Sequence, residues 1–133
     1  GGTAPGTLVA AGLVKLLPIT SAQIAYPAVW ESASQDQGFL FKTTTGESIL
    51  LVPSLTPDPS GWIEQQGGQE RVVRTTTKGG LDLYLTQDKR RALLILDTVA
   101  FDFTYDLSTK STLDYLQTFQ MMLNSVEAAS PGV

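Results

Sequence analysis

Alternating apolar and polar residues mark the second half of the chain. The apolar members of the clearest alternation are Val99, Phe101, Phe103 and Tyr105. Because successive side chains of a β-strand point to opposite faces of its sheet, this period of two predicts a strand over 99–106 with one buried face. The apolar run RALLIL at 91–96 predicts the strand that precedes it.

Two hairpins are predicted upstream of these strands. The first joins GFLFKTT at 38–44 to ESILLVP at 47–53 and places Phe39 and Phe41 on one face. The second joins RVVRTTT to LDLYLT through a turn at 78–80, where glycine supplies the positive φ that tight hairpin turns require. In its second strand the inward side chains are Leu81, Leu83 and Leu85, and the outward ones are Asp82, Tyr84 and Thr86.

Proline and glycine interrupt the pattern on both sides of the first hairpin. Residues 22–30, AQIAYPAVW, predict a strand that ends at Pro27, because proline cannot donate a hydrogen bond to a ladder. Residues 53–69 contain three prolines and three glycines, which oppose helices and ladders alike. We therefore expect the longest irregular segment there.

Two helices are predicted, one near each end of the chain. The C-terminal helix runs from a cap signature at Ser111 and Asp114 to Glu127. Its apolar stripe consists of Leu113, Leu116, Phe119, Leu123 and Val126. The N-terminal helix is short, spans Leu8–Leu17 and stops at Pro18. Its apolar face is expected to pack on the core of its own domain, or alternatively to insert into a neighbouring subunit or lie on a membrane.

Together these elements predict the α+β class. An antiparallel β-meander sheet of about six or seven strands is covered by the short N-terminal helix and by the amphipathic C-terminal helix. The 133 residues suffice for one hydrophobic core. We expect a tether and short apolar helix over 1–19, a single α+β domain over 20–129 and a tail over 130–133.

Composition excludes several kinds of chemistry. The chain has no cysteine and no histidine, which rules out thiol nucleophiles, imidazole bases, disulfides and Cys/His zinc sites. Asp102 and Asp106 share one face of a predicted strand but lie about 13 Å apart, too far for the carboxylate pair of a glycosidase. The sequence therefore predicts no enzyme, no metal site and no cofactor.

Charge and hydropathy limit the partners. The net charge is −4, so phosphate backbones and anionic membranes are repelled, and nucleic acid is not an expected partner. The longest apolar run, at 7–20, is interrupted by Lys15 and Pro18 and is shorter than a helix that spans a bilayer. We expect no transmembrane segment.

Candidate contact residues are of three kinds. Trp62 lies among prolines and glycines, and it is either a contact anchor for a partner, flanked by Asp58, or a lid folded over the sheet edge. A basic cluster at a predicted turn consists of Lys89, Arg90 and Arg91. This cluster either grips an anionic group or is a solvated turn. Leu8 and Leu13 are candidates for subunit contacts.

The order of landmarks resembles a known family. The phrases IAYPAVW, GFLFKTTTGESILL, FDFTYDLS and YLQTFQMMLNSV are similar to those of the PsbP-like group, small exported α/β/α sandwich proteins. The matching positions are Tyr26, Pro27, Trp30, Phe39, Phe41, Phe119, Leu123, Ser125 and Val126. The resemblance implies a non-catalytic role in an exported protein of the periplasm or cell envelope, or of the thylakoid lumen in a photosynthetic lineage.

Two functions follow as hypotheses. The first is an exported binding or assembly module that contacts a partner protein through a sheet face or the 53–69 loop, with a lipid anchor possible upstream of Gly1. The second is a structural subunit of a filament or larger assembly, in which the apolar N-terminal segment contacts the next copy. The partner is thus another protein or further copies of the chain.

Overall fold

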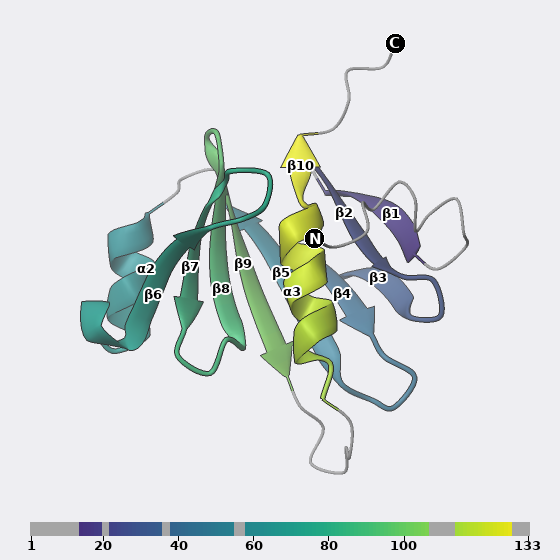
Figure 1. The fold of residues 1–133 in the computed structure, drawn as a ribbon. Helices are drawn as coiled ribbons and strands as arrows, with labels where there is room; N and C mark the ends of the chain where they lie inside the picture. The colour runs from purple at the N-terminus through teal and green to yellow at the C-terminus, as the bar shows by residue number, and fades with distance from the viewer. Residues whose placement is uncertain (1–13, 20–21, 36–37, 55–57, 107–113, 129–133) are drawn as a thin grey trace.

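A seven-stranded antiparallel sheet forms the centre of the protein (Figure 1). The computed structural model describes residues 14–19, 22–35, 38–54, 58–106 and 114–128. The strands of the sheet are β3 (Glu31–Gln35), β4 (Gly38–Lys42), β5 (Ser48–Ser54), β6 (Val72–Thr76), β7 (Asp82–Thr86), β8 (Arg91–Leu96) and β9 (Val99–Asp106). The predicted α+β class and antiparallel sheet are confirmed.

The sheet consists of two meanders joined at its centre. Its strand order is β3-β4-β5-β9-β8-β7-β6, so β3 to β5 form one meander and β6 to β9 the other. They join where β5 pairs with β9, with Ser48 opposite Asp106 and Ser54 opposite Ala100. The order therefore departs from a single meander at this pair, and β3 and β6 become the edge strands.

The predicted hairpins form, and β8 and β9 have the predicted bounds. Leu83 and Phe101 are buried in the main core, on the same face of the sheet. Tyr84 points to the other face, as predicted, but it is buried there by a helix. Both faces of this part of the sheet are thus covered.

The N-terminal segment is a strand where the structure describes it, so the predicted helix is wrong for residues 14–17. β1 (Val14–Ile19) pairs antiparallel with β2 (Ala22–Pro27), and β10 (Glu127–Ala128) flanks β2 on its other side. Pairing with β2 outweighs the helical spacing of the leucines, and Pro18 is tolerated because β1 is an edge strand. Residues 8–13 lie outside the described residues.

The C-terminal helix α3 (Leu116–Ser125) lies along one face of the sheet (Figure 1). Phe119 is fully buried, with its ring centroid 6.0 Å from that of Phe103 and 5.7 Å from that of Tyr105. The helix begins later than predicted, because Asp114 accepts a hydrogen bond from the N–H of Leu116. Ser111, the other predicted cap residue, lies outside the described part.

A second helix occupies the segment predicted to be irregular, and that prediction is wrong. α2 (Pro59–Gln65) is followed by a 3₁₀ turn, η1 (Gln69–Arg71). The Asp58 side chain accepts a hydrogen bond from the N–H of Gly61, and Pro59 stands in the first turn, where its missing N–H costs nothing. Gly67 and Gly68 end the helix at φ values of 107° and 110°.

Trp62 holds α2 to the sheet. It packs with Tyr84, Leu93 and Ala100 in a small cluster on the face opposite α3. The proline and glycine content of the segment therefore marks the ends of a short helix, whose stability comes from one buried aromatic side chain.

Replacing Phe119 with alanine is expected to lower the free energy of unfolding by about 3 to 5 kcal/mol, because the loss of this fully buried ring leaves a cavity between α3 and β9. Urea denaturation followed by circular dichroism measures the loss. Gln117→Ala, at an exposed position of the same helix, is the control and should change stability by less than about 0.5 kcal/mol. Equal effects of the two variants would show that α3 does not close the core.

Candidate functional site

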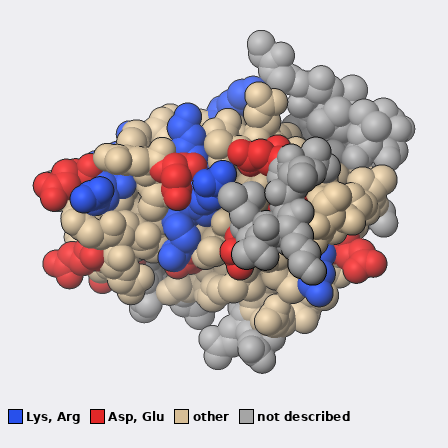
Figure 2. Space-filling view, turned by 90° about the horizontal axis from the view of Figure 1, so that it is seen from below, with Lys and Arg blue, Asp and Glu red and all other residues tan. Residues whose placement is uncertain are grey.

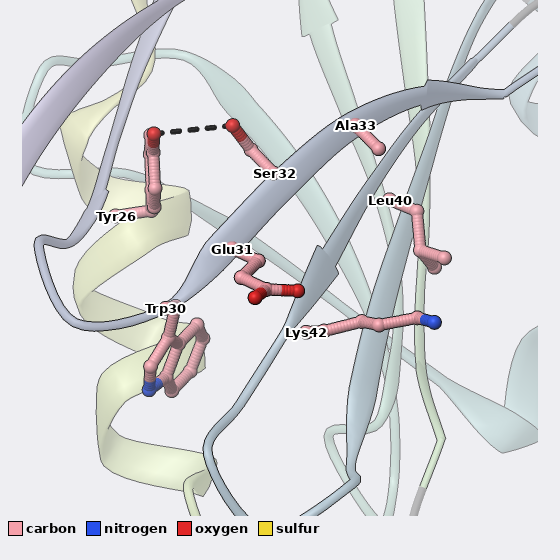
Figure 3. Close-up of a pocket in the computed structure, with 7 residues that line it drawn as sticks. All are labelled: Tyr26, Trp30, Glu31, Ser32, Ala33, Leu40 and Lys42. Atoms are coloured by element: carbon pink, nitrogen blue, oxygen red, sulfur yellow. Dashed lines mark hydrogen bonds between the residues drawn. The ribbon is translucent and has the colours of Figure 1, made fainter.

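A pocket of about 450 Å³ opens beside the edge strand β3 (Figure 3). It is lined by Tyr26, Trp30, Glu31, Ser32, Ala33, Leu40 and Lys42. These residues come from the end of β2, the turn after it, and the paired strands β3 and β4. Aromatic, aliphatic and charged groups thus meet at one edge of the sheet.

The aromatic wall of this pocket is held in place by local bonds. The Trp30 N–H donates to the carbonyl of Pro27 at 3.0 Å, which closes the turn between β2 and β3. The Trp30 ring stands edge-on to that of Tyr115, with centroids 5.2 Å apart. Ser32 Oγ donates to the Tyr26 hydroxyl at 3.1 Å. These contacts hold the two rings in the core, where Tyr26 is 6% and Trp30 5% exposed, so they form the buried back of the pocket.

Two opposite charges stand on the outer wall. Glu31 lies directly opposite Lys42 in the β3–β4 ladder, and both side chains are exposed. Neither forms an ion pair with another described residue. Figure 3 shows the carboxylate and the ammonium group on neighbouring strands, with the Lys42 nitrogen directed away from Glu31. The pocket can therefore offer an acceptor and a donor to one extended ligand.

The outer edge of β3 has no strand beside it among the described residues. The Thr43 N–H donates a hydrogen bond to the carbonyl oxygen of Glu47 at the end of the β4–β5 ladder. Because the backbone groups of alternate residues face opposite neighbouring strands, those of Leu40 and Lys42 are directed toward β3. The backbone N–H and C=O groups of their partners Ala33 and Glu31 therefore point toward β4. The N–H and C=O groups of Ser32 and Ser34 consequently face outward.

A second pocket, of about 440 Å³, lies between α2, β6 and β7. Its lining includes Arg74, whose guanidinium carbon is 5.8 Å from the centroid of the Tyr84 ring. This cation–π contact holds the Arg74 side chain against the Tyr84 ring. The first pocket, whose two charges form no ion pair with any residue that the structure describes, is the stronger candidate for binding.

A carboxylate is buried in the turn that follows β4. Glu47 is 1% exposed, and its Oε2 accepts hydrogen bonds from the hydroxyls of Thr43 and Thr45. Its Oε1 has no hydrogen-bond partner in the described part of the chain. The Thr45 hydroxyl lies 3.2 Å from that of Tyr115, so this network ties the β4–β5 turn to the start of α3.

Hydrogen bonding decides the charge state of Glu47. Burial alone would raise its pKa, but the bonds donated by Thr43 and Thr45 outweigh this and lower the pKa below the ordinary value of 4.5. Burial raises the pKa of the neighbouring Tyr105, and its hydrogen bond to Asp114 adds to the effect. Glu47 is therefore ionised at neutral pH beside neutral hydroxyls.

The predicted contact residues are not gathered into one site. Trp62 lies on the side of α2 that faces the sheet and is 5% exposed. Its indole N–H has no acceptor in the described ranges. Asp58 is the cap of the same helix. Leu8 and Leu13 lie outside the described residues.

The basic cluster stands at the β7–β8 turn, far from α2 in the sequence. Lys89 is exposed at φ 63°. Arg90 pairs with Asp114 at 3.5 Å, and Arg91 pairs with Asp102 at 3.2 Å. Basic and acidic side chains are interspersed on the face seen from below (Figure 2). The two arginines thus stabilise the end of the sheet, and Lys89 is the most accessible member.

Sequence reasoning missed the residues of the pocket. β3 has the sequence ESASQ, which lacks the apolar alternation of a half-buried strand. The signal that could have predicted β3 was its partner β4. The apolar sequence GFLFK is typical of a strand with a neighbour on each side, and only one neighbour, β5, was predicted. Glu47 was missed because a glutamate after a Thr-rich turn is ordinarily exposed.

Within the described residues, no three histidine, cysteine, aspartate or glutamate side chains are grouped to hold a metal ion. No described helix is long and apolar enough to cross a membrane. No protein-family model and no curated protein matches the sequence. The function is therefore inferred from the geometry of the described residues.

Replacing Glu47 with glutamine is expected to lower the melting temperature at neutral pH. Because the folded-state pKa of Glu47 is depressed, its contribution is present above the ordinary pKa of 4.5 and is lost as the pH falls through the folded-state value. The difference in melting temperature between wild type and Glu47→Gln should therefore shrink on acidification. Thermal unfolding from neutral pH to about pH 3 measures it.

Glu64→Gln, at an exposed position of α2, is the matched control. It should leave the melting temperature nearly unchanged across the same pH series. A Glu47→Gln variant as stable as the wild type at neutral pH, or a gap that widens on acidification, would contradict the assigned role of the carboxylate.

Proposed function

We propose that this protein is an exported, non-catalytic binding or assembly module that contacts a partner protein through the outer edge of β3 and the pocket beside it. The observation that carries the proposal is the outer edge of β3, which no strand of the described residues pairs and on which the backbone groups of Ser32 and Ser34 are directed outward. An extended segment of a partner can add to such an edge as a further strand.

The contrast between the two edges of the sheet supports this choice. Natural sheets protect their edges with charged side chains, prolines or covering elements. β6 has Arg74 at its centre and α2 nearby. β3 has Ala33 at its centre and a single charge, Glu31, at its start. Within the described ranges nothing comparable protects β3, which is consistent with regular use of this edge as a contact surface.

The pocket supplies what a backbone ladder lacks. Main-chain hydrogen bonds give affinity without discrimination, whereas side-chain pockets beside the added strand give specificity. Ala33 and Leu40 offer accessible apolar surface in front of the buried rings of Tyr26 and Trp30, and Glu31 and Lys42 offer one charge of each sign. We infer that the preferred segment has an apolar residue flanked by a polar or charged one.

We place the contact surface at β3 rather than in the 53–69 segment. Trp62, the aromatic residue of that segment, is packed against the sheet and has little surface left for a partner. We further propose that the fold is a PsbP-like sandwich and that the chain acts in the periplasm, the cell envelope or a thylakoid lumen. These parts of the proposal are supported by the sequence resemblance and by a composition that has no cysteine and only 17% charged residues.

A photoreactive amino acid at position 34 tests the proposal in cells that produce the full-length protein. The expected result is a covalent adduct with a protein, identified by mass spectrometry, because Ser34 is exposed on the outer edge of β3. The same reagent at position 98, an exposed residue of the β8–β9 turn, is the control. Equal adduct yields at the two positions, or none at position 34, would contradict the proposal.

A further inference from the structure

We infer that the protein segment received by the β3 edge is β3 of a second copy of this chain, paired antiparallel about a two-fold axis at Ala33. The inference depends on the proposed function, in which the β3 edge is the contact surface, and it names the partner. It follows from three properties of β3: the direction of its free backbone groups, its charge pattern and the contrast with β6.

The free backbone groups of β3 are self-complementary in this register. With Ala33 opposite Ala33 of the second copy, Ser32 of each copy lies opposite Ser34 of the other. The outward groups belong to these two serines, so each facing pair exchanges N–H and C=O bonds in both directions. Ala33 then occupies a pair without hydrogen bonds, in which small side chains allow close approach.

The charges of β3 do not oppose this pairing. Glu31 is the only charged residue of the strand, and in the proposed register it lies opposite Gln35 of the second copy. The two Glu31 side chains stand at opposite ends of the strand pair, about 13 Å apart along the strands. That separation exceeds the Debye length of about 8 Å at physiological salt, so the repulsion between them is largely screened.

The other edge of the sheet fails the same comparison. An equivalent pairing of two β6 strands about their central residue would place Arg74 directly opposite Arg74 of the second copy. Like charges directly opposite each other destabilise a strand pair. Two copies therefore associate through β3 and leave β6 outside.

A two-fold pairing of β3 closes on itself. The two copies form one continuous sheet and expose no further β3 edge, so the assembly stops at the dimer instead of growing into a filament. Ala33 lines the pocket beside β3, so the pockets of the two copies become neighbours across the axis.

Single-cysteine variants test the register, because the chain has no cysteine of its own. In Ala33→Cys the two Cα atoms would lie about 4.5 Å apart, within the range of roughly 4.4 to 6.8 Å that a disulfide accepts. In Ser34→Cys, an exposed neighbour on the same strand, the two cysteines would be offset by about 7 Å along the strands. Under mild oxidation of the purified full chain, Ala33→Cys should form dimers at least about tenfold faster.

A charge pair at the same position provides a test that needs no disulfide. Ala33→Arg alone and Ala33→Glu alone should each weaken the self-association of the full chain at least about tenfold, measured by sedimentation velocity. A mixture of the two should restore it, because Arg then faces Glu across the axis. Circular dichroism of each variant establishes that the fold is kept.

The outcomes separate the inference from the proposed function. Equal disulfide rates for Ala33→Cys and Ser34→Cys would overturn the two-fold register, as would a disulfide that forms only between Ala33→Cys and Arg74→Cys chains, which indicates head-to-tail growth. If position 34 captures a different protein in cells while Ala33→Cys stays monomeric, the inference fails and the proposed function stands. If position 34 captures nothing, the proposed function fails as well.

Discussion

The pairing of β5 with β9 is the contact on which the rest of the structure depends. It joins Ser48–Ser54 to residues about fifty positions later in the chain and turns two meanders into one sheet. β9 also carries Phe103 and Tyr105, on which Phe119 of α3 packs. Because β5 and β9 occupy the centre, β3 and β6 become the edges, and the surface proposed for binding follows from this one pairing.

Local patterns sufficed for the elements whose side chains alternate strongly. β8, β9 and both hairpins could be predicted because Phe101 and Leu83 belong to runs with a period of two. Elements that form because a neighbouring strand pairs with them, and not because of their own side-chain pattern, could not be predicted. β3 forms because β4 pairs with it, and β1 forms because β2 does. The leucines of β1 also fit helical spacing, so the sequence alone favoured the wrong period.

The segment of α2 shows a different limit. Its prolines and glycines suggested irregular backbone, yet Pro59 begins the helix and Gly67 follows its end. The composition therefore indicated where the element begins and ends, but it did not indicate that the residues between are helical. Burial of Trp62 against β7 and β8, a tertiary contact, decides the outcome.

The candidate site was hidden for a related reason. Large and charged residues such as Trp62 and Arg91 drew attention in the sequence, but the fold uses Trp62 as packing and Arg91 in an ion pair. The residues left at the surface of β3, among them Ala33 and Ser34, have ordinary side chains. Their importance lies in backbone groups whose direction depends on strand order, and strand order is not readable from local periodicity.

Hydrogen exchange at the individual amides of β3 tests the central claim most directly. In dilute solution the amides of Ser32 and Ser34 should exchange rapidly while that of Ala33, which points toward β4, is protected. As the protein concentration rises, the two serine amides should become protected and that of Ala33 should change little. Serine amides that are protected at every concentration, or exchange that never depends on concentration, would contradict an edge that is free in one molecule and paired between two.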